Sequence, residues 1–140
     1  MSAALPSDAR AHAFPVSVKG VVICDDRVLL LANERDEWEL PGGKLELDET
    51  PQACVVRELA EETGLAVELG RPLAPYVYWV GGRVPVVILP FVCRAASFAG
   101  LRRSAEHRAI ATFPVAALPL SSLPVGYVRA IRDAAGLPLE

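Results

Sequence analysis

Three glutamates near the middle of the sequence have the spacing of a metal site. Glu58, Glu61 and Glu62 stand at positions i, i+3 and i+4, so they would share one face of a helix. Like charges at these spacings destabilise a helix by about 0.2–0.5 kcal/mol per pair. Glu61 and Glu62 would also lie in the last helical turn, where the helix dipole favours cations. A hard divalent cation such as Mg²⁺ would relieve this repulsion, so the spacing indicates a metal-binding helix.

The alternative is a solvated acidic face on a surface helix. Charged stripes on helices are most often plain surface, and Arg57 could support Glu61 at i+4. The preceding residues favour the metal site. Gly42 and Gly43 permit close backbone approach to an ion, and their carbonyl groups could face it together with the carboxylates.

The helix that carries the glutamates has local start and stop signals. Thr50 is typical of an N-cap, Pro51 of the first helical position, and Gly64 of the residue that ends a helix. We therefore predict a glycine loop followed by a helix of about three turns. The core-facing side is predicted from the apolar positions Val55, Val56, Leu59 and Ala60.

The segment from Gly43 to Leu65 resembles the Nudix box, the signature of the Nudix hydrolases. Five residues separate Gly43 from Glu49, and after seven more comes the run RELAEETGL at residues 57–65. Every position that the signature specifies is matched. The resemblance implies an α/β fold, namely an α/β/α sandwich with a mixed β-sheet. It also implies hydrolysis of a pyrophosphate bond in a nucleoside diphosphate linked to another moiety, with release of a mononucleotide.

The resemblance assigns roles to residues of the box. Glu61 could act in catalysis by orienting the attacking water as well as by binding metal. Glu49 and Arg57 are implied to support the site through a charge-assisted hydrogen bond. The implied cofactor is Mg²⁺, for which Mn²⁺ could substitute. The implied metal ligands are Glu58, Glu61, Glu62 and a backbone carbonyl of Gly42 or Gly43.

Further candidates lie outside the box. Many family members place another acidic residue beyond it, and Glu106 is the candidate here for a general base; the alternative is a surface glutamate. Arg35, Arg102 and Arg103 are weaker candidates for contacts with substrate phosphate, since each could equally be a solvated loop charge.

Aromatic and histidine residues give weaker signals. Four aromatic residues could stack on a base, although aromatic residues in strands more often fill a core. No role is predicted for His12 or His107, because neither has a partner at a recognisable spacing. The aromatic candidates are Tyr76, Tyr78, Trp79 and Phe91.

The substrate is less well defined than the reaction. A (d)NTP, ADP-ribose or a nucleotide sugar all fit, and small single-domain relatives favour (d)NTPs by analogy only. A non-hydrolysing Nudix-fold nucleotide sensor is the main alternative. The intact glutamates argue against it, because a binder need not keep a repulsive ligand set. Isomerase chemistry on the same fold is a third alternative.

Composition limits the partners. The 140 residues are 52% hydrophobic and 22% charged, which suits a single domain, expected over residues 15–140 behind a loose leader at 1–14. A net charge of −3 favours neither nucleic acid nor an anionic membrane as partner. The expected partner is a small nucleotide-type substrate. The family resemblance also admits a homodimer.

Cysteines and apolar stretches give the remaining expectations. The three cysteines lack a C-x-x-C pair, so we predict neither a zinc site nor a disulfide framework. No signal peptide or apolar stretch of about 18 residues is found, and a cytoplasmic location is the default.

Periodicity predicts the remaining elements. A loop is expected at 95–105, and Gly81-Gly82 marks a hairpin turn. The strand at 83–93 is so continuously apolar that both of its faces should be covered. The predicted strands are 16–24, 28–32, 67–69, 76–80, 83–93 and 109–113, and a second helix is predicted at 125–135.

Overall fold

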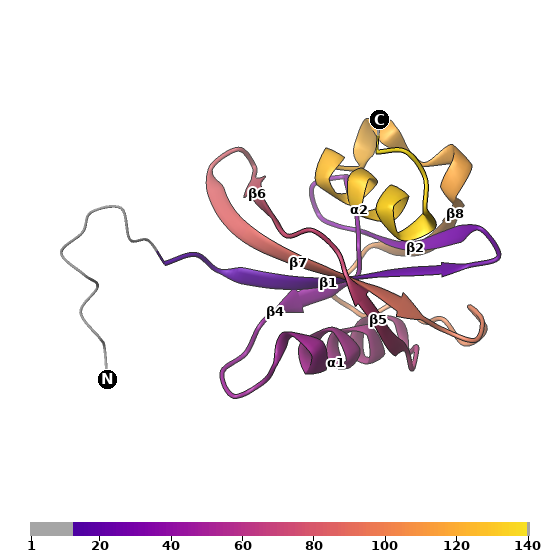
Figure 1. Ribbon diagram of the computed structural model, residues 1–140, viewed down its shortest axis with the longest axis horizontal. Helices are drawn as coiled ribbons and strands as arrows, with labels where there is room; N and C mark the ends of the chain where they lie inside the picture. The colour runs from indigo at the N-terminus through magenta and orange to yellow at the C-terminus, as the bar shows by residue number, and fades with distance from the viewer. Residues whose placement is uncertain (1–12, 140) are drawn as a thin grey trace.

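A computed structural model describes residues 13–139 of the chain (Figure 1). The predicted leader at 1–14 lies outside the described residues except for Ala13 and Phe14. The strands are β1 (Val16–Cys24), β2 (Arg27–Ala32), β3 (Trp38–Glu39), β4 (Gly42–Lys44), β5 (Glu68–Pro72), β6 (Tyr76–Val80), β7 (Val84–Arg94) and β8 (Ala109–Pro114). The helices are α1 (Pro51–Thr63) and α2 (Val125–Ala135), with short 3-10 helices η1 (Val115–Ala117) and η2 (Leu120–Ser122).

The strands form a mixed sheet. The order along its main path is β3-β2-β1-β7-β5, while β4 pairs with β1, β6 with β7 and β8 with β2. β1 and β7 run parallel, from Val16 opposite Val87 to Val22 opposite Cys93, and the other pairs are antiparallel. The predicted strands and both predicted helices are present. β3 and β4 were not predicted, and Gly42 and Gly43 lie in β4 rather than in a free loop.

The two helices cover opposite sides of the sheet, as Figure 1 shows, so the α/β/α sandwich with a mixed sheet is confirmed. Two apolar cores result. β7 contributes to both, because Ile88 packs in the core beneath α2 whereas Phe91 and Cys93 pack in the core beneath α1. The expectation that this strand is covered on both faces is confirmed from Ile88 to Cys93, whereas Val84 at its start is exposed.

The ends of α1 follow the local signals. The Thr50 hydroxyl accepts a hydrogen bond from the N–H of Ala53 at 3.1 Å, and Gly64 ends the helix with φ 77°. The Gly64 N–H also donates to the Ala60 carbonyl. The two hydrogen bonds satisfy backbone groups that a helix terminus leaves unpaired. Helix α1 then packs closely on β1, because a Cβ at Gly20 would overlap the side chain of Leu59.

The buried side of α1 differs from the prediction. Val55 and Leu59 are fully buried, but Val56 is 37% exposed and Ala60 is exposed. Cys54, Glu62 and Thr63 are buried instead. The helix is thus rotated so that a carboxylate lies between apolar residues, which a count of apolar positions cannot anticipate.

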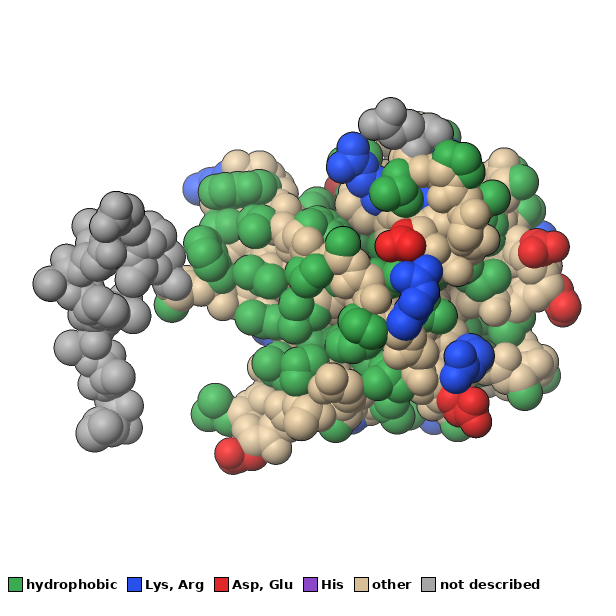
Figure 2. Space-filling view, in the orientation of Figure 1, with side chains coloured by type: hydrophobic (Ala, Val, Ile, Leu, Met, Phe, Trp, Pro, Cys, Tyr) green, Lys and Arg blue, Asp and Glu red, His purple; other side chains and the backbone are tan. Residues whose placement is uncertain are grey.

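Surface features complete the description. Hydrophobic side chains gather over the β6–β7 hairpin in the view of Figure 2, including the exposed Val77, Trp79 and Val84. Cys24, Cys54 and Cys93 are free thiols. Among residues 13–139, no helix combines the length and apolar character needed to span a membrane.

Candidate active site

Glu62 of α1 is a buried carboxylate held by two other segments. Its Oε1 accepts a hydrogen bond from the Gly42 N–H at 2.7 Å, and its Oε2 lies 3.4 Å from His107 Nε2. The residue is only 5% exposed, and this burial raises the pKa of the Glu62 carboxyl to about 7. Gly42 has φ +145°, and a Cβ there would overlap the Val18 carbonyl, so only glycine fits this approach.

Glu58, one turn earlier, lies directly against β4. A Cβ added at Gly43 would be 2.5–2.7 Å from its carboxylate atoms. The carboxylate also accepts a hydrogen bond from Arg57 at 3.1 Å. Burial raises the pKa of Glu58, and the charges of Glu61 and Glu106 raise it further. The two glycines therefore leave room for two carboxylates beside the strand.

Arg57 of α1 hydrogen-bonds to Glu49 in the loop that precedes the helix. Its Nε and Nη2 donate to the two carboxylate oxygens of Glu49 at 3.0 and 2.8 Å, the bidentate geometry that guanidinium groups favour. The Arg57 hydrogen bonds lower the pKa of Glu49 to about 2. Arg57 Nη1 also lies 3.2 Å from Glu61 Oε2, and the Glu61 side chain is 59% exposed. The pair between Glu49 and Arg57 thus has the expected form.

Three residues without a predicted role join the carboxylates. His107 Nε2 lies 3.0 Å from Glu39 Oε1, and the ring is buried. The Glu39 hydrogen bond raises the pKa of His107. Burial opposes ionisation of Glu39, but the His107 hydrogen bond and the charge of Lys19 outweigh it and lower the pKa of Glu39. Burial also opposes the charge of Lys19, yet Tyr127, Glu39 and Glu62 raise its pKa overall.

Weak sequence signals mark these three positions. Lys19 is a charge within an otherwise apolar strand, and Glu39 stands three residues before Gly42. His107 follows Glu106 directly. None of the three signals shows which partners the side chains meet, because β1, β3 and the loop before β8 are far apart in sequence.

The carboxylates suit a divalent cation chemically but do not enclose a ready site. Among residues 13–139, no three His, Cys, Asp or Glu side chains are arranged as a metal-binding group. Arg57 engages Glu58 and Glu61, and Glu62 faces inward. The Gly43 carbonyl lies 4.0 Å from the Cys54 thiol. The donors are nevertheless hard oxygens gathered beside Gly42 and Gly43, which have no side chains, and hard oxygens are the ligand type that Mg²⁺ prefers.

The other candidate residues lie at different distances from this cluster. Glu106 is exposed, its carboxylate makes no hydrogen bond or ion pair within the described chain, and its charge acts on Glu58. Arg35 instead pairs with two neighbouring glutamates. Arg103 donates to the His107 carbonyl at 2.8 Å, and Arg102 packs over Gly64. Glu106 is therefore the candidate that adjoins the box carboxylates electrostatically.

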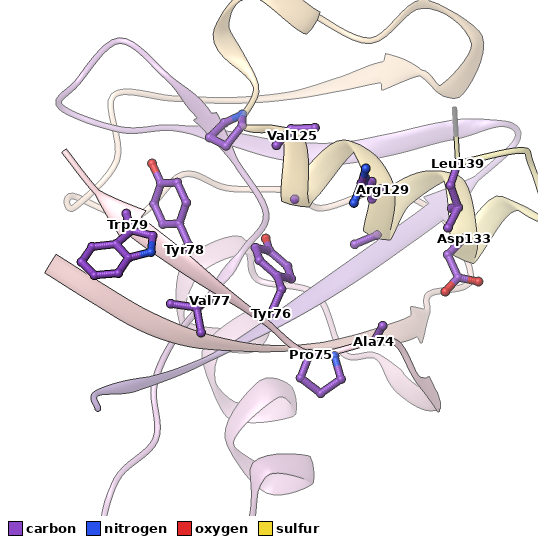
Figure 3. A pocket seen from close by; sticks show the side chains of 13 residues that line it. Ala74, Pro75, Tyr76, Val77, Tyr78, Trp79, Val125, Arg129, Asp133 and Leu139 are labelled. Atoms are coloured by element: carbon purple, nitrogen blue, oxygen red, sulfur yellow. The ribbon is translucent and has the colours of Figure 1, made fainter. Parts of the chain in front are cut away.

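The aromatic candidates divide between a cavity and a core. A cavity of about 470 Å³ lies between β6 and α2, and Tyr76, Tyr78 and Trp79 line it (Figure 3). Phe91 belongs to the core beneath α1. The cavity shares no residue with the carboxylate cluster, although the Tyr78 hydroxyl donates to Glu37 at 3.4 Å.

The chain is similar in sequence and in fold to known proteins. The chain is 43% identical over 94 residues to a MutT-like protein of Streptomyces ambofaciens, covering 66% of this chain and 58% of that protein. It is 33% identical over 101 residues to the CTP pyrophosphohydrolase of Escherichia coli K12, covering 68% of this chain and 73% of that one. A solved MutT NUDIX hydrolase from Burkholderia pseudomallei superposes with a TM-score of 0.75 at 26% identity, covering 86% of this chain and 98% of the other. The NUDIX domain matches residues 14–133. The chain therefore belongs to the NUDIX domain family.

Proposed function

We propose that this protein is a Mg²⁺-dependent pyrophosphohydrolase whose site is the carboxylate cluster of α1. The observation that carries the proposal is the placement of Glu58 and Glu62 beside Gly42 and Gly43. The pKa values of the Glu58 and Glu62 carboxyls are raised, first by burial and further by neighbouring negative charge. Buried carboxylates that repel each other are costly unless a cation neutralises them.

Glu58, Glu61 and Glu62 would hold the ion, with a carbonyl of Gly42 or Gly43. When bound, Mg²⁺ would neutralise pyrophosphate charge and lower the pKa of water. Glu61 is exposed enough to swing from Arg57 toward Glu58, or to orient the attacking water. Arg57 and Glu49 would keep the loop and helix in register.

Glu106 is the proposed general base. Its carboxylate has no hydrogen-bond or ion-pair partner within residues 13–139, so it is available to accept the proton of the attacking water. For substrate phosphate, Arg102 is the more available contact. Arg35 and Arg103 would have to exchange their present carboxylate and carbonyl partners.

The proposed substrate class is the nucleoside triphosphates, with CTP tested first. The support is the similarity to a CTP pyrophosphohydrolase across 73% of that protein. Hydrolysis would release a mononucleotide and pyrophosphate. ADP-ribose and nucleotide sugars would release a mononucleotide and a phosphorylated partner, so the products identify the substrate class.

A nucleotide sensor is the second candidate. It is favoured by one observation, that Arg57 already engages both Glu58 and Glu61, so the carboxylates form no ready metal group within the described residues. In a sensor this arrangement would persist in the presence of Mg²⁺. In the enzyme Mg²⁺ would displace Arg57 from at least one of the glutamates.

The test is a hydrolysis screen with chromatographic product analysis. The protein is incubated with Mg²⁺ and a panel of CTP, the other (d)NTPs, ADP-ribose, nucleotide sugars and dinucleoside polyphosphates, and Glu62→Gln serves as the control. We expect the wild type alone to release a mononucleotide. Nucleotide binding without turnover in either protein would support the sensor instead.

A further inference from the structure

We propose that His107 is a positioning residue that fixes the Glu62 carboxylate and, with it, the loop that carries Glu106. This inference rests on the proposed function. Its basis is a buried three-way contact, in which His107 Nε2 lies 3.0 Å from Glu39 Oε1 and 3.4 Å from Glu62 Oε2. All three side chains come from different segments of the chain, namely β3, α1 and the loop before β8.

The hydrogen on the His107 ring can be placed by chemistry. The Glu39 carboxylate is ionised, because its pKa is lowered, and an ionised carboxylate only accepts hydrogen bonds, so Nε2 donates to Glu39 Oε1. The other ring nitrogen, Nδ1, lies 3.5 Å from the Ser104 hydroxyl, which can donate to it. Both ring nitrogens are thus satisfied with the hydrogen on Nε2, and no change of charge is needed for the role.

His107 completes the restraint on Glu62. The Gly42 N–H holds Oε1 at 2.7 Å, and His107 faces Oε2. The single hydrogen on Nε2 is donated to Glu39 at 3.0 Å, and Glu62 Oε2 is a second, longer contact of the same group at 3.4 Å, so the lone pairs of Oε2 stay open to a cation or water. The Gly42 hydrogen bond to Oε1 and the His107 contact with Oε2 come from separate segments, and together they limit the rotation of the carboxylate plane. Without His107, Oε2 is free to turn away.

The same side chain anchors the loop of Glu106. Arg103 holds the His107 carbonyl at 2.8 Å, and Arg108 pairs with Asp36 on the surface. Among residues 13–139, His107 is the side chain of the 104–108 loop that hydrogen-bonds to a carboxylate of β3 and contacts a carboxylate of α1 at 3.4 Å. Because Glu106 is its immediate neighbour, the position of the proposed base depends on this contact.

The experiment compares two replacements of His107, of which only one can place an N–H group where Nε2 lies. His107→Gln can place an amide N–H near the position of Nε2, whereas His107→Asn is too short to reach it. Arg108→Ala is the matched control, because it removes an exposed ion pair from the same loop. Three quantities are measured: the Mg²⁺ concentration at half-maximal rise in Tm, kcat and KM for CTP, and the chemical shift and hydrogen exchange of the Gly42 amide without metal.

We expect His107→Asn to raise the half-maximal Mg²⁺ concentration and lower kcat by about 10–100-fold each, as for other residues that hold metal ligands in place. KM should change little, since the proposed role of His107 is to contact Glu39 and Glu62 and not to bind substrate. The Gly42 amide should shift and exchange faster, because its acceptor has become mobile. His107→Gln should lose less than His107→Asn, and Arg108→Ala should match the wild type.

Two results would overturn the positioning role. One is a folded His107→Asn protein with the wild-type Mg²⁺ midpoint and kcat. The other is an unchanged Gly42 amide in that variant. The amide measurement also separates this inference from the proposed function. If the wild type neither hydrolyses nucleotides nor responds to Mg²⁺, the proposed function fails, and a shifted Gly42 amide in His107→Asn would still uphold the restraint on Glu62.

Discussion

Replacing Gly43 by alanine tests whether turnover depends on the close approach of β4 to Glu58. The added Cβ would lie 2.5 Å from the nearest carboxylate atom, whereas ordinary van der Waals contact begins at 3.4 Å. The carboxylate must therefore retreat by the difference, about 0.9 Å, which the end of a flexible side chain can do by rotating. A misplacement of about 1 Å at a reacting centre costs on the order of 100-fold in rate, so we expect kcat to fall by about that factor.

The stability of Gly43→Ala should stay close to that of the wild type. Replacing glycine by alanine at a compatible position stabilises by about 0.4–1 kcal/mol through the unfolded state. Moving Glu58 off its preferred rotamer costs about 0.5–1.5 kcal/mol. The two effects nearly cancel, so Tm should change by no more than about 4 °C.

The assay is mononucleotide release with Mg²⁺, run beside thermal unfolding of the same samples. Lys44→Ala is the control, because it alters an exposed side chain of the same strand. A Gly43→Ala protein with both the wild-type rate and the wild-type Tm would refute the reasoning, since Glu58 would then not need its place against β4. A large loss of Tm would instead show that the strand cannot accommodate the Cβ.

Three further predictions concern the carboxylates. Burial raises the pKa of Glu62 from 4.5 to about 7, so its ionisation should remove up to about 3 kcal/mol of stability as pH rises through that window. In metal-free buffer the Tm of Glu62→Gln minus the Tm of the wild type should therefore increase as pH rises from 4.5 to 7. A Tm difference that stays constant over this range would contradict the prediction. Hydrogen bonds from Arg57 lower the pKa of Glu49 to about 2, so the stability they provide is present at neutral pH and is lost as pH falls from about 4.5 toward 2. The Tm difference between wild type and Arg57→Ala should shrink across that range, and a constant difference would mean that Arg57 stabilises by packing alone. Glu106→Gln should lower kcat by about 10²–10⁴-fold with no change in the Mg²⁺-induced Tm shift. An unchanged kcat would place the general base elsewhere.

Local signals predicted the elements that local chemistry determines. Helix α1 begins after Thr50 and ends before Gly64, as the sequence indicated, because capping needs only neighbouring backbone groups. The bounds of α2 were also predicted, from an apolar stripe closed by Gly136. The two-residue strand β3 and the three-residue strand β4 were missed, since such short segments form only by pairing with β2 and β1.

The rotation of α1 was predicted wrongly for a physical reason. Apolar positions alone placed Val56 and Ala60 inward, but both are exposed. The inward arc is centred nearer Glu62, whose burial is stabilised by the Gly42 N–H and the neighbouring Lys19. A carboxylate that is buried because of its partners is invisible to a hydrophobic pattern.

Within the box, the sequence predicted that the carboxylates come together, and outside the box Glu106 is the predicted residue that adjoins them electrostatically. The spacing of Glu58 and Glu62 was sufficient to bring them to one helical face beside the glycines. Lys19, Glu39 and His107 join them through tertiary contacts between segments that are distant in sequence, and no spacing rule links such positions. The sequence likewise could not show that Arg35 and Arg103 already have partners.

The parallel pairing of β1 with β7 has a consequence for how the chain is made. Val16 pairs with Val87, so β1 leaves the ribosome 71 residues before its main partner in the sheet. At about 5–20 residues per second, roughly 4–14 s separate the two strands during translation. In that interval β1 and the apolar side of the newly made α1 lack the strand that will cover them. Such sequence-distant pairing slows folding and favours aggregation, so soluble yield should depend on translation speed and on chaperones that shield the nascent chain.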